Sequence, residues 1–192
     1  MALPPSRMGS GAARILTGLL EARTGQVLSE GRAWRMETAL KPVLRDHGLQ
    51  DIDELAGKLL RSRNPRLDED VVNALLNNES SFFRDLQIFD LIHRQILPRI
   101  QEARGDRVLR IWSAGCSTGQ EAYSLAIRFC NEAARWAGWR IEILATDISS
   151  AAIDQARSGI FSQMDVQRGL PIGDLTAGLP AHRFLTPEFG PG

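Results

Sequence analysis

The strongest constraint on the fold is a β-rich run that passes through a turn of small residues directly into a helix. Residues 108–112 read Val-Leu-Arg-Ile-Trp, the turn at 113–119 reads Ser-Ala-Gly-Cys-Ser-Thr-Gly, and a helical pattern extends from there to about residue 136. A second β-rich run at 141–145 ends in Thr146-Asp147, and another helical pattern follows it. Strands that alternate with helices in this order open a doubly wound parallel sheet. We therefore expect an α/β fold whose ligand-binding residues lie beyond the carboxyl ends of the strands.

The residues that precede this segment are helical in pattern. Apolar residues recur at intervals of three and four from about Ala12 to Leu76, and a second helix-rich stretch runs from Asp68 to about Ala103. Pro98 is expected to kink or end one of these helices. Basic residues lie between the apolar positions of the first region, namely Arg32, Arg35, Lys41 and Arg45. They are either a solvated helix face or a docking face for an acidic partner.

Composition and charge exclude several classes of protein. Hydrophobic residues make up 43% of the 192, which is enough for a packed core, and a net charge of zero argues against binding nucleic acid through its phosphates. Cys116 and Cys130 belong to no Cys-x-x-Cys or Cys/His cluster, so neither a zinc site nor a disulfide framework is indicated. The histidines, His47, His93 and His182, fall in no motif and are expected on the surface or on helix faces. Unpaired thiols and the lack of a signal-peptide pattern or a membrane-length apolar run predict a cytoplasmic location.

The turn after the first β-rich run is the first candidate binding element. Gly115 and Gly119 let the backbone approach a ligand, and the N–H groups at the following helix start can hold a polar head group. The turn is neither a P-loop nor Gly-x-Gly-x-x-Gly. Asp147, at the end of the second run, has two open interpretations: it accepts hydrogen bonds from ribose hydroxyls, or it caps the next helix, where Ser149 and Ser150 can also serve.

Three further positions carry chemistry. Glu121 has two interpretations that are compatible with each other: it pairs with a ligand ammonium, and it closes a capping box with Thr118. Arg84 either clamps a carboxylate or forms an ion pair with Asp85 or Asp90. The neighbouring aromatic pair, Phe82 and Phe83, is expected in the core. Cys116 has no neighbouring base in the sequence and is expected to be a small packing residue.

Together these segments resemble the CheR-type chemotaxis receptor methyltransferases. Residues 78–85, Asn-Glu-Ser-Ser-Phe-Phe-Arg-Asp, look like that family's Asn-x-Ser/Thr-x-Phe-Phe-Arg-Glu/Asp segment. Residues 110–124, Arg-Ile-Trp-Ser-Ala-Gly-Cys-Ser-Thr-Gly-Gln-Glu-Ala-Tyr-Ser, are similar to its cofactor loop, and 145–148 with 156–161 match the next block. The family usually has Glu and Pro where this chain has Gln120 and Ala122.

The resemblance implies a protein-glutamate O-methyltransferase that uses S-adenosyl-L-methionine. It implies an all-helical N-terminal domain followed by a Rossmann-like methyltransferase domain, and methyl transfer to glutamate side chains of the cytoplasmic domain of methyl-accepting chemoreceptors in chemotaxis signal transduction. Carried over by position and joined by the turn glycine, the cofactor-binding candidates are Asn78, Ser80, Arg84, Gly115, Glu121 and Asp147. No metal, nucleic acid or membrane insertion is implied. Arg32, Arg35 and Lys41 become candidates for receptor docking.

The expected organisation has three parts: a helical N-terminal domain at 1–76 with disordered first residues, a partial methyltransferase domain at 77–172 and an irregular tail at 173–192. After residue 172 the family continues for about another hundred residues, whereas this sequence becomes rich in Gly and Pro. A further strand is therefore expected to be missing beside the first one. One alternative is a catalytically inactive remnant that binds receptor or cofactor. A small-molecule methyltransferase is disfavoured by the Phe82-Phe83-Arg84 segment and the helical first domain.

Overall fold

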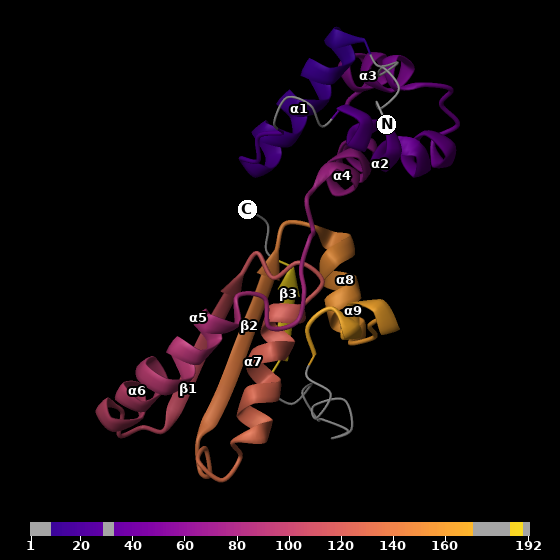
Figure 1. Cartoon of the computed structure of the whole chain (residues 1–192). Coiled ribbons are helices and arrows are strands. Elements are labelled where there is room, and N and C mark those ends of the chain that lie inside the picture. The colour runs from indigo at the N-terminus through magenta and orange to yellow at the C-terminus, as the bar shows by residue number, and fades with distance from the viewer. Residues whose placement is uncertain (1–8, 29–32, 171–184, 190–192) are drawn as a thin grey trace. The chain divides into compact units, whose positions relative to one another are not determined.

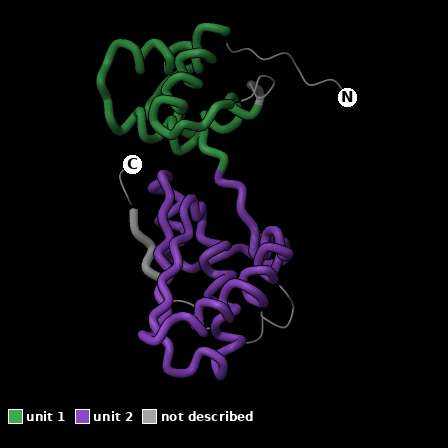
Figure 2. The backbone as a smooth tube through the Cα atoms, turned by 90° about the vertical axis from the view of Figure 1, so that its left-hand side faces the viewer, with its two compact units in different colours: residues 1–77 green, residues 78–192 purple. Residues whose placement is uncertain are grey.

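The computed structural model describes residues 9–28, 33–170 and 185–189. The chain divides into two compact units, residues 1–77 and residues 78–192 (Figure 2). As the resemblance implies, helices come first and a mixed α/β region with parallel strands follows.

The first unit is helical throughout its described part. Its helices are α1 (Ser10–Thr24), α2 (Ala33–Asp46), α3 (Ile52–Arg61) and α4 (Pro65–Leu75) (Figure 1). α1 ends at Gly25, whose φ of 70° few other residues adopt without strain. α4 begins where the Asn64 side chain accepts the Leu67 N–H and Pro65 occupies the first turn. The apolar faces pack together, with Leu16, Leu20, Leu40, Leu55, Leu67 and Val71 fully buried.

The candidate docking residues of this unit lie partly within the described range. Arg35 and Lys41 are exposed on α2. Arg32 lies outside the described residues. Arg45 is exposed and pairs with its neighbour Asp46 at 3.1 Å. A docking role for Arg32, Arg35 and Lys41 stays a prediction.

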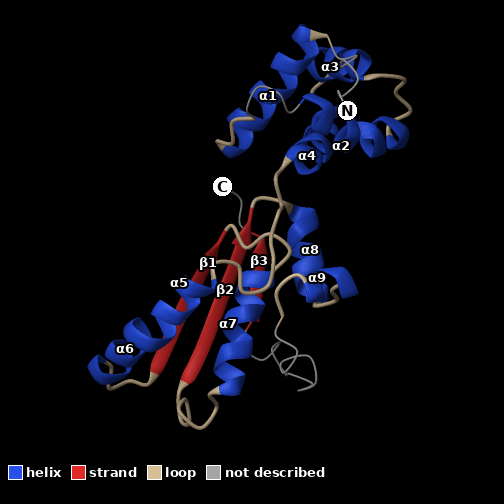
Figure 3. Cartoon of the chain, in the orientation of Figure 1, coloured by secondary structure: helices blue, strands red, loops and turns tan. Residues whose placement is uncertain are grey.

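The second unit begins with a broken helical segment and continues as an α/β layer. The segment comprises α5 (Leu86–Leu91), the π-helical turn η1 (Ile92–Ile96) and α6 (Leu97–Ala103). Then follow β1 (Val108–Ala114), α7 (Gln120–Asn131), β2 (Arg140–Asp147), α8 (Ser150–Ser158), α9 (Gln163–Gln167) and β3 (Leu185–Phe189). The described strands form a parallel sheet in the order β1-β2-β3, in which Leu109 lies opposite Ile141 and Ser113 opposite Ala145 (Figure 3).

The stretch from Asp68 to Ala103 is helix-rich, as expected, with a break after α4 where Phe83 and Asp85 adopt left-handed backbone angles that no α-helix contains. Two other expectations about the elements are wrong. The helix expected to reach residue 136 ends at Asn131. The tail is not wholly irregular, since Leu185–Phe189 forms β3. The sequence pattern did not predict this strand because it contains Pro187, and proline is rare inside strands. Proline is tolerated at sheet edges, and β3 is an edge of the described sheet.

One face of the sheet carries the core of the second unit. Leu109 of β1 and Ile143 of β2 are buried against Phe129 of α7 and Ile153 of α8. The segment α5–α6 adds Phe89 and Leu97 to the same cluster. The helices therefore lie on the face toward which the buried strand residues alternate.

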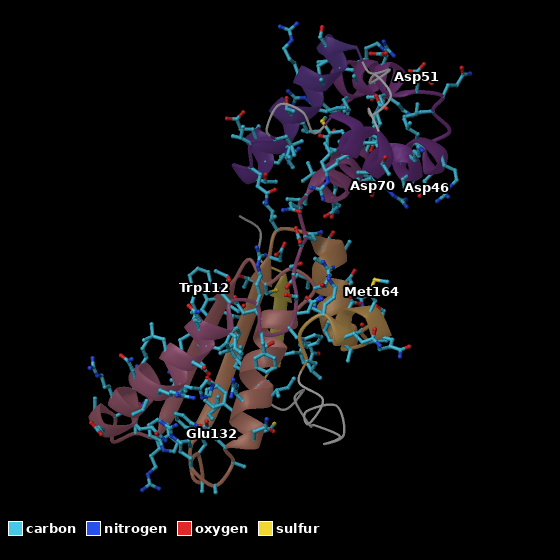
Figure 4. All side chains as sticks on the ribbon, viewed as in Figure 1. Asp46, Asp51, Asp70, Trp112, Glu132 and Met164 are labelled. Carbon is cyan, nitrogen blue, oxygen red and sulfur yellow. The ribbon has the colours of Figure 1, made fainter. Side chains whose placement is uncertain are left out.

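The opposite face is left open by the described residues. There Arg110 Nε donates to Glu142 Oε2 at 2.8 Å, and Trp112 Nε1 donates to Thr146 Oγ1 at 2.9 Å. Trp112 is nonetheless 68% exposed (Figure 4). A parallel sheet is normally covered on both faces. The described residues cover only one face of this sheet.

Candidate cofactor-binding site

The loop between β1 and α7 is held against the end of β2. The backbone N–H groups of Gly115 and Cys116 both donate to the carbonyl of Thr146, at 2.8 and 2.9 Å. Gly119 has a φ of 96°, and a Cβ there would lie 3.0 Å from the Cβ of Ala156. Only glycine suits this point, so the loop that begins α7 is closely fixed.

Asp147 joins two loops rather than capping a helix. Its Oδ2 accepts the Ser117 N–H at 2.7 Å and its Oδ1 accepts the Ser149 N–H at 2.9 Å. The cap of α8 is Ser149, whose Oγ accepts the Ala152 N–H at 3.2 Å. The capping interpretation of Asp147 is therefore wrong. A carboxylate offers about four lone-pair positions, so the two hydrogen bonds leave acceptor capacity for a ligand.

Glu121 is positioned by a buried serine. α7 begins after Gly119 without a side-chain cap, and Thr118 Oγ1 donates to Gln120 Oε1, so the capping box expected for Glu121 does not form. Instead Ser113 Oγ donates to Glu121 Oε1 at 2.7 Å. Ser113 is 2% exposed and faces inward from β1. The carboxylate is thus held at the carboxyl end of β1.

The 78–85 segment makes a tight turn against α7. Phe82 and Phe83 are buried, as expected, in edge-to-face contacts with Phe161 (4.9 Å between ring centres) and Phe89 (5.5 Å). Arg84 is exposed between two left-handed residues, and its Nη1 donates to the carbonyl of Glu79 at 3.1 Å.

The carboxylates proposed as ion-pair partners of Arg84 are accounted for differently. Asp90 pairs with Arg128 at 3.4 Å. Asp85 occupies the left-handed position that begins α5. The geometry therefore favours an Arg84 that remains available to a ligand carboxylate.

Asn78 ties the segment to both loops. Its carbonyl accepts Ser117 Oγ at 2.7 Å, and its Nδ2 lies 3.5 Å from Ser149 Oγ. Ser117 therefore touches Asn78 through its hydroxyl and Asp147 through its backbone N–H. Ser117 thus joins the 78–85 segment and the end of β2 to the loop in which it lies.

These pieces enclose a pocket of about 100 Å³. Its lining residues are Glu79, Ser80, Ser81, Arg84, Phe89, Gly115, Cys116, Ser117 and Glu121. Four predicted site residues, Ser80, Arg84, Gly115 and Glu121, line it, and the other two, Asn78 and Asp147, hold its wall. A cation and an anion, Arg84 and Glu121, thus border one small cavity.

Cys116 lines the pocket without nucleophilic character. It is 1% exposed, and burial together with the charges of Asp147 and Glu121 raises its pKa to about 11. The thiol is therefore protonated at neutral pH, in agreement with the packing role expected for it.

Sequence reasoning assigned no role to the serines that organise this site. Ser113, Ser117 and Ser124 are buried, and each bonds a residue of the pocket or of the turn beside it. The one available signal was a serine at the inward position of a buried strand, Ser113, where an apolar residue is usual. Ser117 and Ser124 gave none, because their partners lie about 40 residues away in the sequence.

Among the described residues, no group of three or more His, Cys, Asp or Glu is placed to hold a metal ion. No described helix combines the length and the apolar character that crossing a membrane requires. His93 is not on the surface: it is 4% exposed in η1, and burial lowers its pKa.

Comparisons with known proteins point to one family. The family model described as CheR methyltransferase, SAM binding domain, matches residues 78–175. The chain is 33% identical over 156 residues to chemotaxis protein methyltransferase 1 of Pseudomonas aeruginosa, covering 79% of this chain and 56% of that protein. It is 31% identical over 159 residues to the chemotaxis protein methyltransferase of Vibrio anguillarum, covering 82% and 57%. For the Salmonella typhimurium protein the values are 32% over 148 residues, 77% and 49%. The chain spans about half the length of these relatives.

Proposed function

Because this chain belongs to the CheR methyltransferase family, we propose that its pocket binds S-adenosylmethionine and that the chain is the donor-binding part of a protein-glutamate methyltransferase acting on chemoreceptors. The observation that carries the proposal is the convergence of Ser80, Arg84, Gly115 and Glu121 on one cavity. Asn78 and Asp147 fix the loops around it.

The charges of the pocket fit the amino-acid end of the cofactor. That end carries a carboxylate and an ammonium group, and Arg84 and Glu121 offer the opposite charges. The hydrogen bond from the Ser113 hydroxyl holds the Glu121 carboxylate in place. Asp147 keeps acceptor capacity for ribose hydroxyls beside the loop that it anchors.

The size of the pocket fits only part of the cofactor. A cavity of about 100 Å³ is below the roughly 300–1,000 Å³ of ordinary small-molecule sites. The pocket shares Arg84, Phe89 and Glu121 with a larger groove along β1. We infer that a complete site needs a further wall on that side.

The proposed chemistry makes few demands on acid–base groups. When bound, S-adenosylmethionine supplies a methyl group activated by a sulfonium. A glutamate acceptor has an ordinary pKa of about 4.3, so it is already ionised at neutral pH and needs no strong base. The residues of this chain would contribute by orienting the donor, because the positioning of donor and acceptor supplies most of the rate of such a transfer.

A direct test is calorimetric titration of the chain with S-adenosylhomocysteine. Binding should be detectable and should weaken at least tenfold in Glu121→Gln, which removes the charge but keeps the shape. Glu102→Gln, an exposed carboxylate of α6, is the matched control and should bind as the parent does. Equal affinity in the two variants, or no binding at millimolar ligand, would contradict the proposal.

Receptor recognition is proposed for the helical unit. Arg35 and Lys41 present exposed positive charge on α2, and Arg32 precedes that helix in the sequence. An acidic segment of a chemoreceptor would complement them. Replacing the three with Gln should weaken co-sedimentation with receptor membranes without changing the affinity for S-adenosylhomocysteine.

One alternative function is supported by a specific observation. The groove beside β1 leaves the pocket without a wall in the described structure, as expected of a chain that binds receptor or cofactor without catalysis. Labelled methyl transfer by a fusion of this chain to the part of the Pseudomonas aeruginosa relative that it does not match distinguishes the two functions, because only the donor-binding part of a methyltransferase would gain activity in that fusion.

A further inference from the structure

Ser117 holds a backbone conformation that is unfavourable for any residue with a side chain. It lies in the turn between β1 and α7 and is 7% exposed, and its φ of 52° falls in the left-handed region that glycine adopts without strain. Gly115 and Gly119, on either side of it, supply the other positive φ angles of this turn. A serine kept at such a position beside a binding pocket points to a role for its hydroxyl.

The hydroxyl of Ser117 closes a ring of hydrogen bonds that joins three segments of the chain. Its Oγ donates to the carbonyl of Asn78 at 2.7 Å, and its backbone N–H donates to Asp147 Oδ2 at 2.7 Å. Asp147 Oδ1 accepts the N–H of Ser149 at 2.9 Å, and Asn78 Nδ2 donates to Ser149 Oγ at 3.5 Å. We call these four residues the hydrogen-bond ring. Without the Ser117 hydroxyl, the ring would keep the 78–85 segment attached through its longest bond only.

The hydrogen-bond ring lies between the residues that the proposed function assigns to the two halves of S-adenosylmethionine. Ser80 and Arg84, on the amino-acid side, belong to the 78–85 segment that begins at Asn78. The Arg84 guanidinium also donates to a carbonyl of that segment at 3.1 Å. Asp147, on the ribose side, ends β2. A displacement of Asn78 therefore reaches the backbone that carries the amino-acid side of the site.

We propose that Ser117 is a positioning residue that couples the nucleoside half of the cofactor site to the amino-acid half. The inference rests on the proposed function, in which the pocket binds S-adenosylmethionine. A nucleoside bound at Asp147 restrains that carboxylate, and Ser117 transmits the restraint to Asn78 and the 78–85 segment. Because the first half to bind orders the ring, the second half loses less conformational entropy when it binds. The coupling acts equally in both directions.

Hydrogen exchange in the presence of 5′-methylthioadenosine tests the coupling directly. This nucleoside lacks the amino and carboxylate groups of the cofactor, so it cannot pair with the charged residues of the pocket. At saturating ligand we expect slower exchange at residues 146–149 and, across the ring, at residues 78–85. The second effect should be absent in Ser117→Gly, which loses the hydroxyl but keeps the N–H that Asp147 accepts.

Calorimetry separates this coupling from simple support of the fold. Ser117→Gly should leave the thermal midpoint nearly unchanged, because relief of the strained φ offsets the lost hydrogen bond. Its affinity for S-adenosylhomocysteine should fall at least tenfold, whereas its affinity for 5′-methylthioadenosine should change less than threefold, since that ligand occupies one half only. Ser158→Gly, which removes a hydroxyl at the exposed end of α8, is the matched control and should bind both ligands as the parent does.

A second variant covers a Ser117→Gly chain that does not fold. Ser117→Ala also removes the hydroxyl but keeps the Cβ, so it should show the same loss of transmission and of affinity. The exchange measurement on the parent chain needs no variant at all.

Three results would overturn the coupling: exchange at residues 78–85 that the nucleoside does not slow in the parent, slowing that persists in the Ser117 variants, or parental affinity of Ser117→Gly for S-adenosylhomocysteine. Equal losses for the two ligands would also overturn it, because Ser117 would then support the fold without linking the two halves. If the parent binds neither ligand at millimolar concentration, the proposed function fails and the coupling with it. Binding without transmission removes the coupling alone and leaves the proposed function standing.

Discussion

The backbone N–H of Phe83 donates to the hydroxyl of Ser124 at 2.9 Å, although 41 residues separate them. Ser124 is fully buried in α7, and its hydroxyl donates a hydrogen bond to the carbonyl of Gln120 at 2.6 Å. Phe83 has a φ of 49°, which is costly for an aromatic residue. The bond from α7 therefore stabilises the turn that presents Arg84.

Replacing Ser124 with alanine should destabilise the chain by about 1–3 kcal/mol, because the buried N–H of Phe83 loses its hydrogen-bond acceptor. Urea unfolding measures this loss. Ser158→Ala, which removes two exposed local bonds at the end of α8, should change stability by less than about 0.5 kcal/mol. If both variants unfold alike, the bond from Ser124 does not hold the turn.

Replacing Arg84 with lysine should act as a severe change, although the charge is kept. A planar guanidinium can bind a carboxylate with two parallel hydrogen bonds, whereas an ammonium cannot. We expect at least a tenfold loss of affinity for S-adenosylhomocysteine with an unchanged thermal midpoint. In a full-length protein of this family, receptor methylation should fall as well. Near-parental affinity of the lysine variant would exclude the clamp.

Asp147→Ala should weaken binding of S-adenosylhomocysteine more than a surface substitution such as Asp154→Ala on α8 does. Asp147 anchors both the Ser117 and the Ser149 backbone, so its loss loosens the loop and removes a ligand acceptor together. Asp147→Asn separates the two contributions, since its amide oxygen can still accept one N–H. Calorimetry decides, and unchanged affinity in both variants would leave Asp147 a purely structural role.

Acid should weaken the second unit through His93. Burial lowers the pKa of this imidazole, with Arg128 and Arg135 acting in the same direction and Glu132 opposing them. The Glu132 carboxylate lies 3.4 Å from Nδ1, but the geometry is not that of a hydrogen bond. The unfolded chain therefore takes up a proton near pH 6.5 that the folded chain does not, and stability falls as the pH drops through that value.

Urea unfolding at pH 7.5 and pH 5.5 checks this prediction. His93→Gln should remove most of the pH dependence in that interval. His47→Gln, which alters the histidine that contacts Asp70 in the first unit, should retain it. A slope that survives in the His93 variant would assign the effect to other groups.

The 192-residue chain should not transfer methyl groups at a measurable rate on its own. Its pocket is small and shares Arg84, Phe89 and Glu121 with the larger groove along β1, so the donor would be poorly oriented. Loss of positioning costs orders of magnitude in rate. The assay is labelled methyl transfer to receptor membranes, with a full-length relative as the positive control. Robust turnover would show that the described walls suffice.

The sequence predicted the order of the elements better than their ends. Val108–Ala114 and Arg140–Asp147 were legible because buried parallel strands are rich in β-branched and aliphatic residues. β3 was missed because Pro187 contradicts the usual strand pattern. The break before α5 depends on left-handed backbone angles at Phe83 and Asp85. The residue types at these two positions do not by themselves predict such angles.

The candidate site was predictable in part. Of the six residues predicted from the motifs, Ser80, Arg84, Gly115 and Glu121 are among the nine that line the pocket, and Asn78 and Asp147 hold its wall. The motifs left Asp147 and Glu121 with two interpretations each, and only the positions of Ser149 and Ser113 removed the capping alternatives. Such pairings join residues that are adjacent in space alone, so no local pattern records them.

The apolar groove along β1 also bears on how long such a chain persists in a cell. An apolar surface beside a strand edge that no described strand pairs is what chaperones and proteases recognise in incompletely folded proteins, and it is a template for aggregation. Covering that surface removes that signal. The cellular abundance of a polypeptide with this surface would then be set by the supply of the segment that covers it, and not by its own rate of synthesis.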